Sequence, residues 1–320
     1  MTEIGYTMMC EQRGPKELVR DVQMAESAGF GFAVISDHYF PWVEAMGHSP
    51  YAWSVLGAAA QATSQIELMT YVTCPIKRYH PAVVAQKAAT VGLLSDGRFT
   101  LGLGAGENLN EHVTGGGWPP VNVRHQMLSE AVDIIRLLWA GGYVNFDGRH
   151  FKVDSAKLWD LPDAPLKLGV GASGQQSSQL AGQKADCLIA VEPSPAIVAA
   201  FDAAGGTGKP RVGQLPISYD RDRDTAIERA LELFGWFSGG WKVNSELPGT
   251  AAFEAASRYL RPDDIADSIP CGNSVDTVIG AVNEFADAGF THVALCQIGG
   301  DTQADFIEWW KRELGPALGS

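Results

Sequence analysis

The sequence lacks any long hydrophobic run, any strongly basic segment and any recognisable export signal. No apolar stretch in its 320 residues approaches the ~18 residues of a membrane-spanning helix. The first residues, MTEIGYTMMC, contain neither the basic segment nor the apolar core of a secretory signal. A formal net charge of −13 without a cluster of Lys or Arg argues against nucleic acid and against a membrane surface as partners. We therefore expect a cytoplasmic protein that acts on a small molecule.

Cysteine is also scarce, and its pattern excludes the usual structural uses. The five cysteines are an odd number with no CxxC pair and no Cys/His spacing typical of zinc, and they lie at Cys10, Cys74, Cys187, Cys271 and Cys296. The sequence therefore predicts no metal site and no framework of disulfide bonds.

A repeated junction is present instead, in which an amphipathic helical pattern passes through a small-residue turn into a short, continuously apolar strand. The phrase AESAGF at 25–30 returns as FADAGF at 285–290. Such strands are typical of parallel strands that are buried on both faces. We predict strands near 3–9, 31–36, 66–73, 98–104, 166–171, 186–191, 212–219 and 291–297. Eight strands separated by helices predict an α/β protein with one (β/α)8 TIM barrel domain over 1–320, and a doubly wound sheet is the alternative.

Three segments depart from this repeated unit. Residues 105–121 and 236–272 are rich in Gly, Pro, Trp and Asn and are longer than ordinary connections. Long connections in compact domains are usually functional, so we expect both to be insertions at the active site. Residues 143–153 alternate around Asp147-Gly148, which predicts a surface β-hairpin.

Polar or glycine-rich sequences follow four consecutive predicted strands. They read SDHYFPW (36–42), YVTCP (71–75), GAGENLNEH (104–112) and GVGASGQQS (169–177). In a (β/α)8 barrel the catalytic residues come from the C-terminal ends of the strands. The sequence therefore predicts an active site that these four segments build together.

Two side chains in these segments are suited to proton transfer. Histidine titrates near neutral pH, so His38 is a candidate general acid or base. A carboxyl group in an apolar cleft can carry a proton at neutral pH, and Glu107 shares its loop with Asn108 and Asn110. The alternatives are a structural histidine bonded to the backbone and a loop glutamate paired with Arg124.

Two further features suggest contacts with a planar, phosphate-bearing ligand. The segment LKLGVGASGQQS runs from a strand through glycines into a helix, which offers backbone N–H groups to a phosphate, with close packing as the alternative. Trp42 is a candidate stacking wall, or else a core residue.

Three motifs resemble a known family. SDHYFPW, TYVTCPIKRYHPAVVAQ (70–86) and GLGAGENLNEH together resemble the luciferase-like superfamily, and most closely its F420-dependent branch, which includes glucose-6-phosphate dehydrogenases. The resemblance implies a barrel, usually a homodimer, that holds coenzyme F420, an 8-hydroxy-5-deazaflavin that carries hydride at C5. It implies an oxidoreductase. The alternatives are an FMN-dependent luciferase-like monooxygenase and a non-enzymatic deazaflavin carrier or sensor.

The resemblance also implies roles for individual residues. His38 would take the proton of the substrate hydroxyl, Glu107 would protonate the deazaflavin ring, and Trp42 would line the reacting centre. Tyr71-Val72 corresponds to a bulged, non-prolyl cis peptide against the ring. The other implied cofactor contacts are Asp37, Cys74, Ala105, Asn110, Ser173, Gly174, Gln176 and Ser177, with Ser173 and Gly174 near the phosphate.

The sequence departs from the sugar-phosphate enzymes where they bind the substrate phosphate. Val191 and Ser194 stand where those enzymes have a threonine and a lysine, and 267–272 contains no arginine. Lys242 is the loop lysine that remains for the substrate pocket. Loss of ion-paired donors weakens phosphate binding. We therefore expect a neutral alcohol or carbonyl compound, or an unphosphorylated sugar, with a sugar-phosphate dehydrogenase as the alternative.

Overall fold

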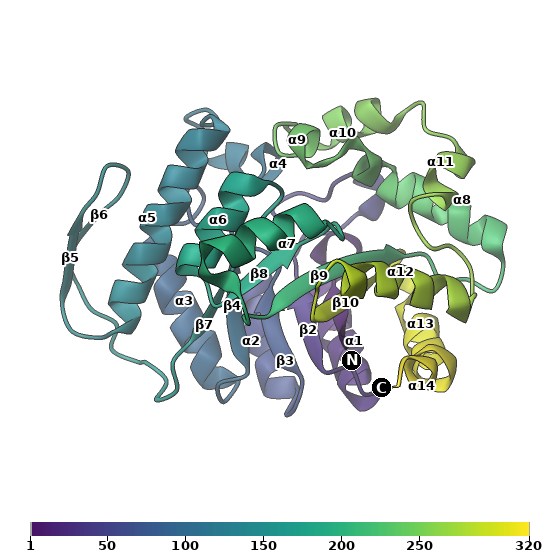
Figure 1. Cartoon of the computed structure of the whole chain (residues 1–320), viewed down its shortest axis with the longest axis horizontal. Coiled ribbons are helices and arrows are strands. Elements are labelled where there is room, and N and C mark those ends of the chain that lie inside the picture. Colours follow the sequence, from purple (N-terminus) through teal and green to yellow (C-terminus); the bar gives the residue numbers. More distant parts are fainter. Residues whose placement is uncertain (1, 320) are drawn as a thin grey trace.

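The computed structural model describes residues 2–319, and its centre is a closed barrel of parallel strands (Figure 1). The strand order around the barrel is β1-β10-β9-β8-β7-β4-β3-β2. The strands are β1 (Glu3–Met8), β2 (Phe32–Ile35), β3 (Glu67–Thr70), β4 (Phe99–Leu103), β7 (Lys167–Gly171), β8 (Cys187–Ala190), β9 (Arg211–Ile217) and β10 (His292–Gln297). All the predicted strands are present, which confirms the (β/α)8 barrel.

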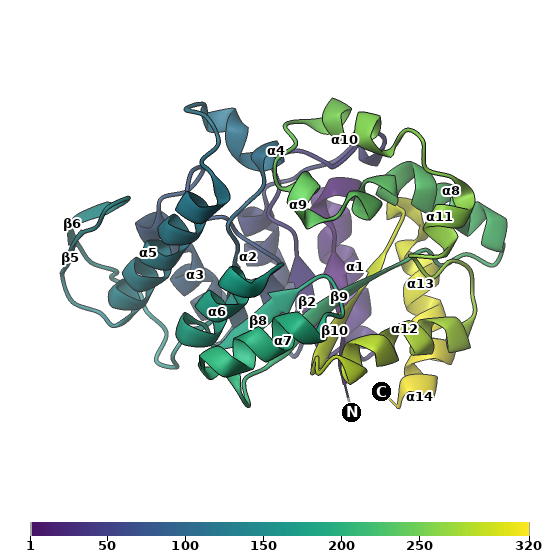
Figure 2. The same cartoon turned by 45° about the horizontal axis from the view of Figure 1, so that its top comes forward.

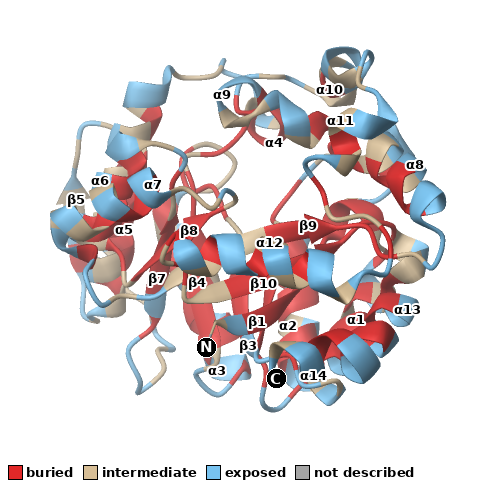
Figure 3. Ribbon diagram, turned by 45° about the vertical axis from the view of Figure 1, so that its right-hand side comes forward, coloured by how far each residue is buried: buried red, intermediate tan, exposed pale blue. Residues whose placement is uncertain are grey.

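The main helices surround the barrel and turn their apolar faces toward it (Figure 3). They are α1 (Pro15–Ser27), α2 (Ala52–Ala62), α3 (Pro81–Leu94), α5 (Val121–Trp139), α6 (Gln175–Lys184), α7 (Pro195–Phe201), α8 (Arg223–Phe234), α12 (Val275–Asp287) and α13 (Gln303–Trp309). Several begin at a proline, whose fixed φ and missing N–H suit the first helical position. Within residues 2–319, no helix combines the length and hydropathy needed to cross a bilayer.

The segments that depart from the repeated unit have defined structures. Residues 143–153 lie in the predicted hairpin, formed by the antiparallel strands β5 (Val144–Asp147) and β6 (Lys152–Ala156). The short helices lie mainly in the predicted insertions, as α4 (Asn108–Glu111), α9 (Trp241–Asn244), α10 (Thr250–Ser257) and α11 (Pro262–Ala266), with α14 (Gly315–Leu318) near the C-terminus. In both views α4, α9 and α10 gather at the end of the barrel that lies away from the chain termini (Figures 1 and 2).

Two apolar clusters fix this arrangement. The larger fills the space between the barrel and its helices. A second cluster joins Trp42 to Trp236, Phe253 and Ile265 of the 236–272 insertion. Burial of these large side chains stabilises the insertion against the C-terminal ends of the strands, at roughly 1.5–3 kcal/mol for each fully buried aliphatic or aromatic side chain.

Candidate active site

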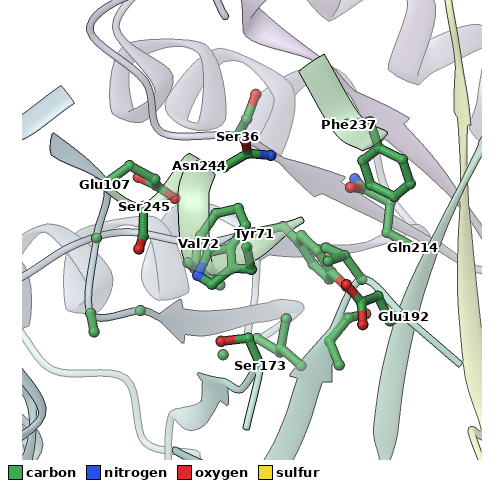
Figure 4. Close-up of a pocket in the computed structure, with 18 of the residues that line it drawn as sticks. Ser36, Tyr71, Val72, Glu107, Ser173, Glu192, Gln214, Phe237, Asn244 and Ser245 are labelled. Atoms are coloured by element: carbon green, nitrogen blue, oxygen red, sulfur yellow. The ribbon is translucent and has the colours of Figure 1, made fainter. Parts of the chain in front are cut away.

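A cavity opens at the C-terminal ends of the barrel strands, and Figure 4 shows part of its wall. Every barrel strand contributes to it from its last residues or from the residues that follow, at Thr7, Ser36, Tyr71, Gly104, Gly171, Ala190, Pro216 and Cys296. The 236–272 insertion adds an aromatic side to the wall through Trp236, Phe237 and Trp241. The described residues therefore form a cavity at the face where the sequence predicted the active site.

His38 lies on the cavity wall and is held by a buried carboxylate. Its Nδ1 lies 3.1 Å from Oε1 of Glu11 and 3.1 Å from the carbonyl oxygen of Phe40. Both partners are acceptors, so Nδ1 carries the hydrogen and Nε2 is left with its lone pair in the neutral ring. Ser36 donates its hydroxyl hydrogen to the other oxygen of Glu11. The arrangement leaves Nε2 as the acceptor atom of the neutral ring, with the Glu11 carboxylate beside Nδ1.

Glu107 approaches the same cavity from the end of β4. Glu107 is 9% exposed and directly precedes α4. The residue before it, Gly106, has a φ of +80°. A Cβ on Gly106 would lie 2.4 Å from Sγ of Cys74, so this turn requires glycine. Figure 4 shows Glu107 across the cavity from Phe237. The structure therefore brings His38 and Glu107 to one chamber.

Asn110 connects the loop of His38 to Glu107 from behind the wall. Its Oδ1 accepts hydrogen bonds from the backbone N–H of Tyr39 at 2.8 Å and of Phe40 at 3.2 Å. Its Nδ2 donates to Glu107 Oε2 at 3.4 Å. Asn110 is buried, and its amide is committed to the protein, so its position favours alignment of the two candidate proton carriers over direct contact with a cofactor.

Trp42 forms a wall of the cavity and also anchors the insertion. It lies 4.7 Å from the His38 ring and stacks on Trp236 with centroids 3.9 Å apart and planes 10° apart. Trp42 therefore lines the cavity and is also a core residue, and its stacking on a planar ligand stays a prediction.

Asp37 does not reach the cavity wall. Its Oδ2 accepts hydrogen bonds from Trp53 Nε1 at 3.0 Å and from Thr73 Oγ1 at 2.8 Å. Its Oδ1 accepts from Tyr79 Oη at 3.2 Å and from Arg78 Nη2 at 3.3 Å. Side chains alternate in direction along an extended segment, so Asp37 points away between Ser36 and His38, which both line the cavity.

The segment after β3 forms the floor of the cavity. The Tyr71-Val72 peptide bond is cis, as the resemblance implied, and both residues line the cavity with Ala105. The Tyr71 hydroxyl donates to the carbonyl oxygen of Ala190 at 2.6 Å. Cys74 lies behind the floor, where burial raises the pKa of its thiol well above the ordinary value and keeps it neutral.

The glycine-rich loop that was predicted to bind a phosphate leads into α6. Some of its backbone N–H groups are hydrogen-bonded within the same segment. Ser173 and Ser177 line the cavity, whereas Gly174 and Gln176 lie off its wall. The Ser177 hydroxyl accepts from the N–H of Ser173 at 3.2 Å and of Gly174 at 3.3 Å. The first turn of α6 still faces the cavity with its N-terminal end.

The expected substrate side of the cavity carries little positive charge. Val191 and Lys242 both line the cavity, and the exposed Glu192 lies beside Val191. Gln214 also lines the cavity, and its amide nitrogen Nε2 donates a hydrogen bond to Thr7 Oγ1 at 3.2 Å. A carboxylate at this position opposes a phosphate group and favours an uncharged ligand.

Comparisons with known proteins identify the family. Residues 2–292 match the luciferase-like monooxygenase family. The chain belongs to this family. A relative from Nocardia farcinica, an F420-dependent glucose-6-phosphate dehydrogenase, is 33% identical over 330 residues that cover 99% of this chain and 98% of the relative.

Solved structures also resemble this luciferase-like protein. An F420-dependent secondary alcohol dehydrogenase in complex with an F420-acetone adduct is 31% identical, with a TM-score of 0.89 and 99% coverage of both chains. The F420-dependent tetrahydromethanopterin reductase from Methanopyrus kandleri is 22% identical, with a TM-score of 0.80 and 99% coverage of both chains. The second likeness shows the fold alone.

Sequence reasoning missed several residues of this luciferase-like site. Glu11 lies just beyond β1, and a carboxylate that follows the first predicted strand is a local signal of the same kind as the polar residues that follow strands two to five. The aromatic wall from Trp236 and Phe237 depends on how the insertion folds, which no local pattern reveals. Arg124 and His125 also line the cavity, although they belong to a helix that the sequence marked only as amphipathic.

Proposed function

We propose that this protein is a coenzyme F420-dependent oxidoreductase that transfers hydride between C5 of the deazaflavin and an uncharged alcohol or carbonyl compound, or an unphosphorylated sugar. The observation that carries the proposal is the buried Glu11–His38 pair on the same cavity as Glu107. The named activities of the 33% and 31% identical relatives support the same cofactor and reaction class.

The cavity fits a flat, tricyclic cofactor. Gly104 and Gly171 line the cavity without a side chain of their own, and a Cβ on Gly104 would lie 2.4 Å from Val72. Aromatic and aliphatic surfaces stabilise planar ring systems by burial. Coenzyme F420 would supply C5 as the acceptor or donor of hydride, and Tyr71, Val72, Ala105 and Ser173 are the proposed contacts.

The proposed roles of the chain's own residues follow from their positions. For alcohol oxidation, Nε2 of His38 accepts the hydroxyl proton, and the Glu11 carboxylate stabilises the charged ring. Glu107 holds the proton needed at the cofactor ring. Trp42 restricts the substrate to one side of His38 and excludes water from it. In the reducing direction His38 donates the proton to the forming alkoxide.

Asp37, Cys74, Asn110, Gly174 and Gln176 have a different place in the proposal. All five were expected to touch the cofactor, and all five lie off the cavity wall. Their hydrogen bonds and packing support roles in holding the strand ends and loops in position.

The substrate preference is a direct test of the proposal. We expect F420 reduction with secondary alcohols at a kcat/KM at least about 10-fold above that with glucose 6-phosphate, because the phosphate would meet the carboxylate of Glu192, and Val191 and Ser194 offer it no charged donor. A panel of alcohols and of sugars with and without phosphate, followed by F420 absorbance, measures this. A strong preference for the phosphorylated sugar would contradict our interpretation of Val191 and Ser194.

The same purified protein distinguishes the cofactor alternatives. Titration with F420 and with FMN, followed by fluorescence, should show binding of F420. Binding of FMN alone in the micromolar range would favour the monooxygenase. Reduction of bound F420 by any alcohol in the panel would exclude a carrier or sensor without enzymatic activity.

Replacing Glu11 with glutamine should separate orientation from charge. The variant keeps the size of the side chain but loses the charge beside His38, so we expect kcat to fall about 10- to 100-fold. The exposed Glu232→Gln variant on α8 is the matched control and should leave kcat unchanged. A kcat of the Glu11→Gln variant equal to that of the unaltered protein would refute the electrostatic role.

A homodimer in the cytoplasm is part of the proposal. Several apolar side chains are exposed on the outer helices, namely Met24 on α1 and Val83, Leu93 and Leu94 on α3. Exposed apolar side chains on the outer helices favour a contact with another subunit. The cytoplasmic location is an expectation from the sequence.

A further inference from the structure

Two side chains that end in hydrogen-bond acceptors lie together on the substrate side of the cavity. Glu192 follows β8, Gln214 lies on β9, and both line the cavity. The parallel register pairs Ala190 with Gly213, so Gln214 lies one residue beyond this pair and Glu192 two residues beyond it. Figure 4 shows Glu192, Gln214 and Phe237 on the same side of the cavity.

The donors beside these acceptors are engaged elsewhere. The Tyr71 hydroxyl, at the end of β8, donates to the carbonyl oxygen of Ala190 at 2.6 Å. The Gln214 amide donates through Nε2 to Thr7 Oγ1 at 3.2 Å, which leaves Oε1 as its free acceptor. Across residues 2–319, no group donates a hydrogen bond to this Oε1 or to the exposed carboxylate of Glu192. A ligand that binds here must therefore bring its own donors.

The backbone around Glu192 is held in place by its neighbours in the sequence. Glu192 precedes Pro193, and a residue before proline is largely confined to extended conformations. The N–H of Ser194 donates to the carbonyl oxygen of Glu192 at 2.8 Å, and α7 begins at Pro195. A preorganised backbone loses little conformational freedom when a ligand binds. The position therefore suits a side chain that selects between substrates.

The other residues of the substrate chamber favour an uncharged ligand with apolar faces. Phe237 and Trp241 line the cavity with aromatic rings, against which the C–H groups of a ligand can pack. Lys242 lines the same cavity as Glu192, so a charged ligand of either sign would meet a like charge in it. An uncharged molecule with C–H faces and more than one hydroxyl group satisfies both the aromatic rings and the free acceptors.

We propose that the substrate is a polyhydroxy compound, namely a diol, a polyol or an unphosphorylated sugar, and that Glu192 and Gln214 select it by accepting hydrogen bonds from its unreacting hydroxyl groups. The inference rests on the proposed function and narrows its substrate class. One hydroxyl group meets Nε2 of His38, and a second one, further along the same molecule, donates to the Glu192 carboxylate. A simple alcohol leaves that carboxylate to water, so the two ligands differ by one charge-assisted hydrogen bond.

The experiment compares pairs of alcohols that differ by one hydroxyl group. The pairs are pentan-2-ol with pentane-2,4-diol and hexan-2-ol with hexane-2,5-diol, and F420 absorbance gives kcat/KM for each. We expect the unaltered protein to prefer the diol about 10-fold in at least one pair, the usual effect of a hydrogen bond to a charged group. Glu192→Ala should lower that preference about 10-fold. Glu192→Gln and Gln214→Leu should each lower it about 3-fold, because one acceptor becomes neutral or is lost.

The controls separate selectivity from general damage to the enzyme. The ratio of the two kcat/KM values within one variant does not depend on the amount of active enzyme, and the melting temperature checks that each variant is folded. Glu232→Ala removes an exposed carboxylate on α8 outside the cavity and should leave the ratio unchanged. If Glu192→Ala lowers kcat/KM equally for both members of every pair, Glu192 only shapes the chamber and its role in selection is refuted.

The remaining outcomes test the inference and the proposed function separately. Reduction of F420 by both members of every pair at equal kcat/KM overturns the inference and leaves the F420-dependent function standing. Failure of every alcohol to reduce F420 overturns the proposed function itself. A third probe, 4-aminopentan-2-ol, tests the charge of the ligand. If it is preferred over pentane-2,4-diol and Glu192→Ala abolishes that preference, the carboxylate binds an ammonium group and the assignment of a polyhydroxy substrate is wrong.

Discussion

Replacing His38 with alanine should reduce turnover by about 10²–10⁴-fold, the usual contribution of a positioned general acid or base, while the affinity for F420 stays nearly the same. The reason lies in the orientation of the ring. Nδ1 is taken up by Glu11 and by the carbonyl oxygen of Phe40, so Nε2 is the ring atom available to a substrate hydroxyl. The ring is not part of the proposed cofactor floor, which comes from Tyr71, Val72 and Ala105.

Two measurements on the purified variant are sufficient. Initial rates of F420 reduction with the best alcohol give kcat, and fluorescence titration gives the Kd of the cofactor. His150→Ala on the β5–β6 hairpin is the control, since that ring lies beside Gln126 and outside the cavity. Loss of cofactor binding with turnover preserved at saturation would show that His38 holds the cofactor and does not move the proton.

Replacing Arg78 with methionine should lower the free energy of unfolding by about 3–5 kcal/mol, the range for breaking a buried ion pair from one side. Arg78 Nη2 lies 3.3 Å from Asp37 Oδ1, and its Nε lies 3.3 Å from Glu111 Oε1. Both carboxylates have 0% side-chain exposure. The variant would leave two buried carboxylates without the cation that joins the ends of β2, β3 and β4.

This loss should depend on pH in a defined direction. Burial raises the pKa of Glu111 while Arg78 lowers it, so removing the guanidinium raises that pKa further. At a pH between the pKa of Glu111 in the unfolded state and its higher pKa in the folded state, the native protein binds more protons than the unfolded chain. The stability of the variant therefore falls as the pH rises. Urea unfolding should therefore show a smaller destabilisation at pH 5.5 than at pH 8.

The half-exposed pair between Arg136 and Asp186 provides the comparison for this prediction. Its side chains are 36% and 45% exposed, and Arg136→Met should cost less than about 1 kcal/mol at either pH. A destabilisation of Arg78→Met that is equally small, or that grows as the pH is lowered, would contradict the account of a buried ionic centre.

The barrel could be predicted from sequence because its signals are local. Each buried parallel strand is a short apolar run, and polar residues follow it at the face where barrels place their sites. The positions of single side chains were harder to predict, because one residue of offset in an extended segment reverses the direction of a side chain. Asp37 and His38 are neighbours, yet one supports the barrel from outside the cavity and the other lines it.

Residues that meet only in three dimensions could not be derived in this way. Glu11 and His38 come from different strand ends, and Arg124 reaches the cavity from the helix that follows the first insertion. The aromatic wall of Trp236 and Phe237 requires the second insertion to fold back across the barrel. These positions depend on tertiary packing, for which the sequence carries no periodic signal.

The stacked pair of Trp42 and Trp236 joins two parts of the site that come from separate stretches of the sequence. The proposed proton carriers come from the barrel itself, whereas the aromatic side of the cavity comes from one contiguous stretch, 234–246. Exchanging that stretch up to residue 244, with the stacked tryptophan kept, would reshape the substrate chamber and retain the Ser245 and Glu246 carbonyl oxygens that accept hydrogen bonds from Asn108, beside Glu107. Evolution can therefore diversify what such a protein accepts by altering a single loop, and laboratory selection can follow the same route.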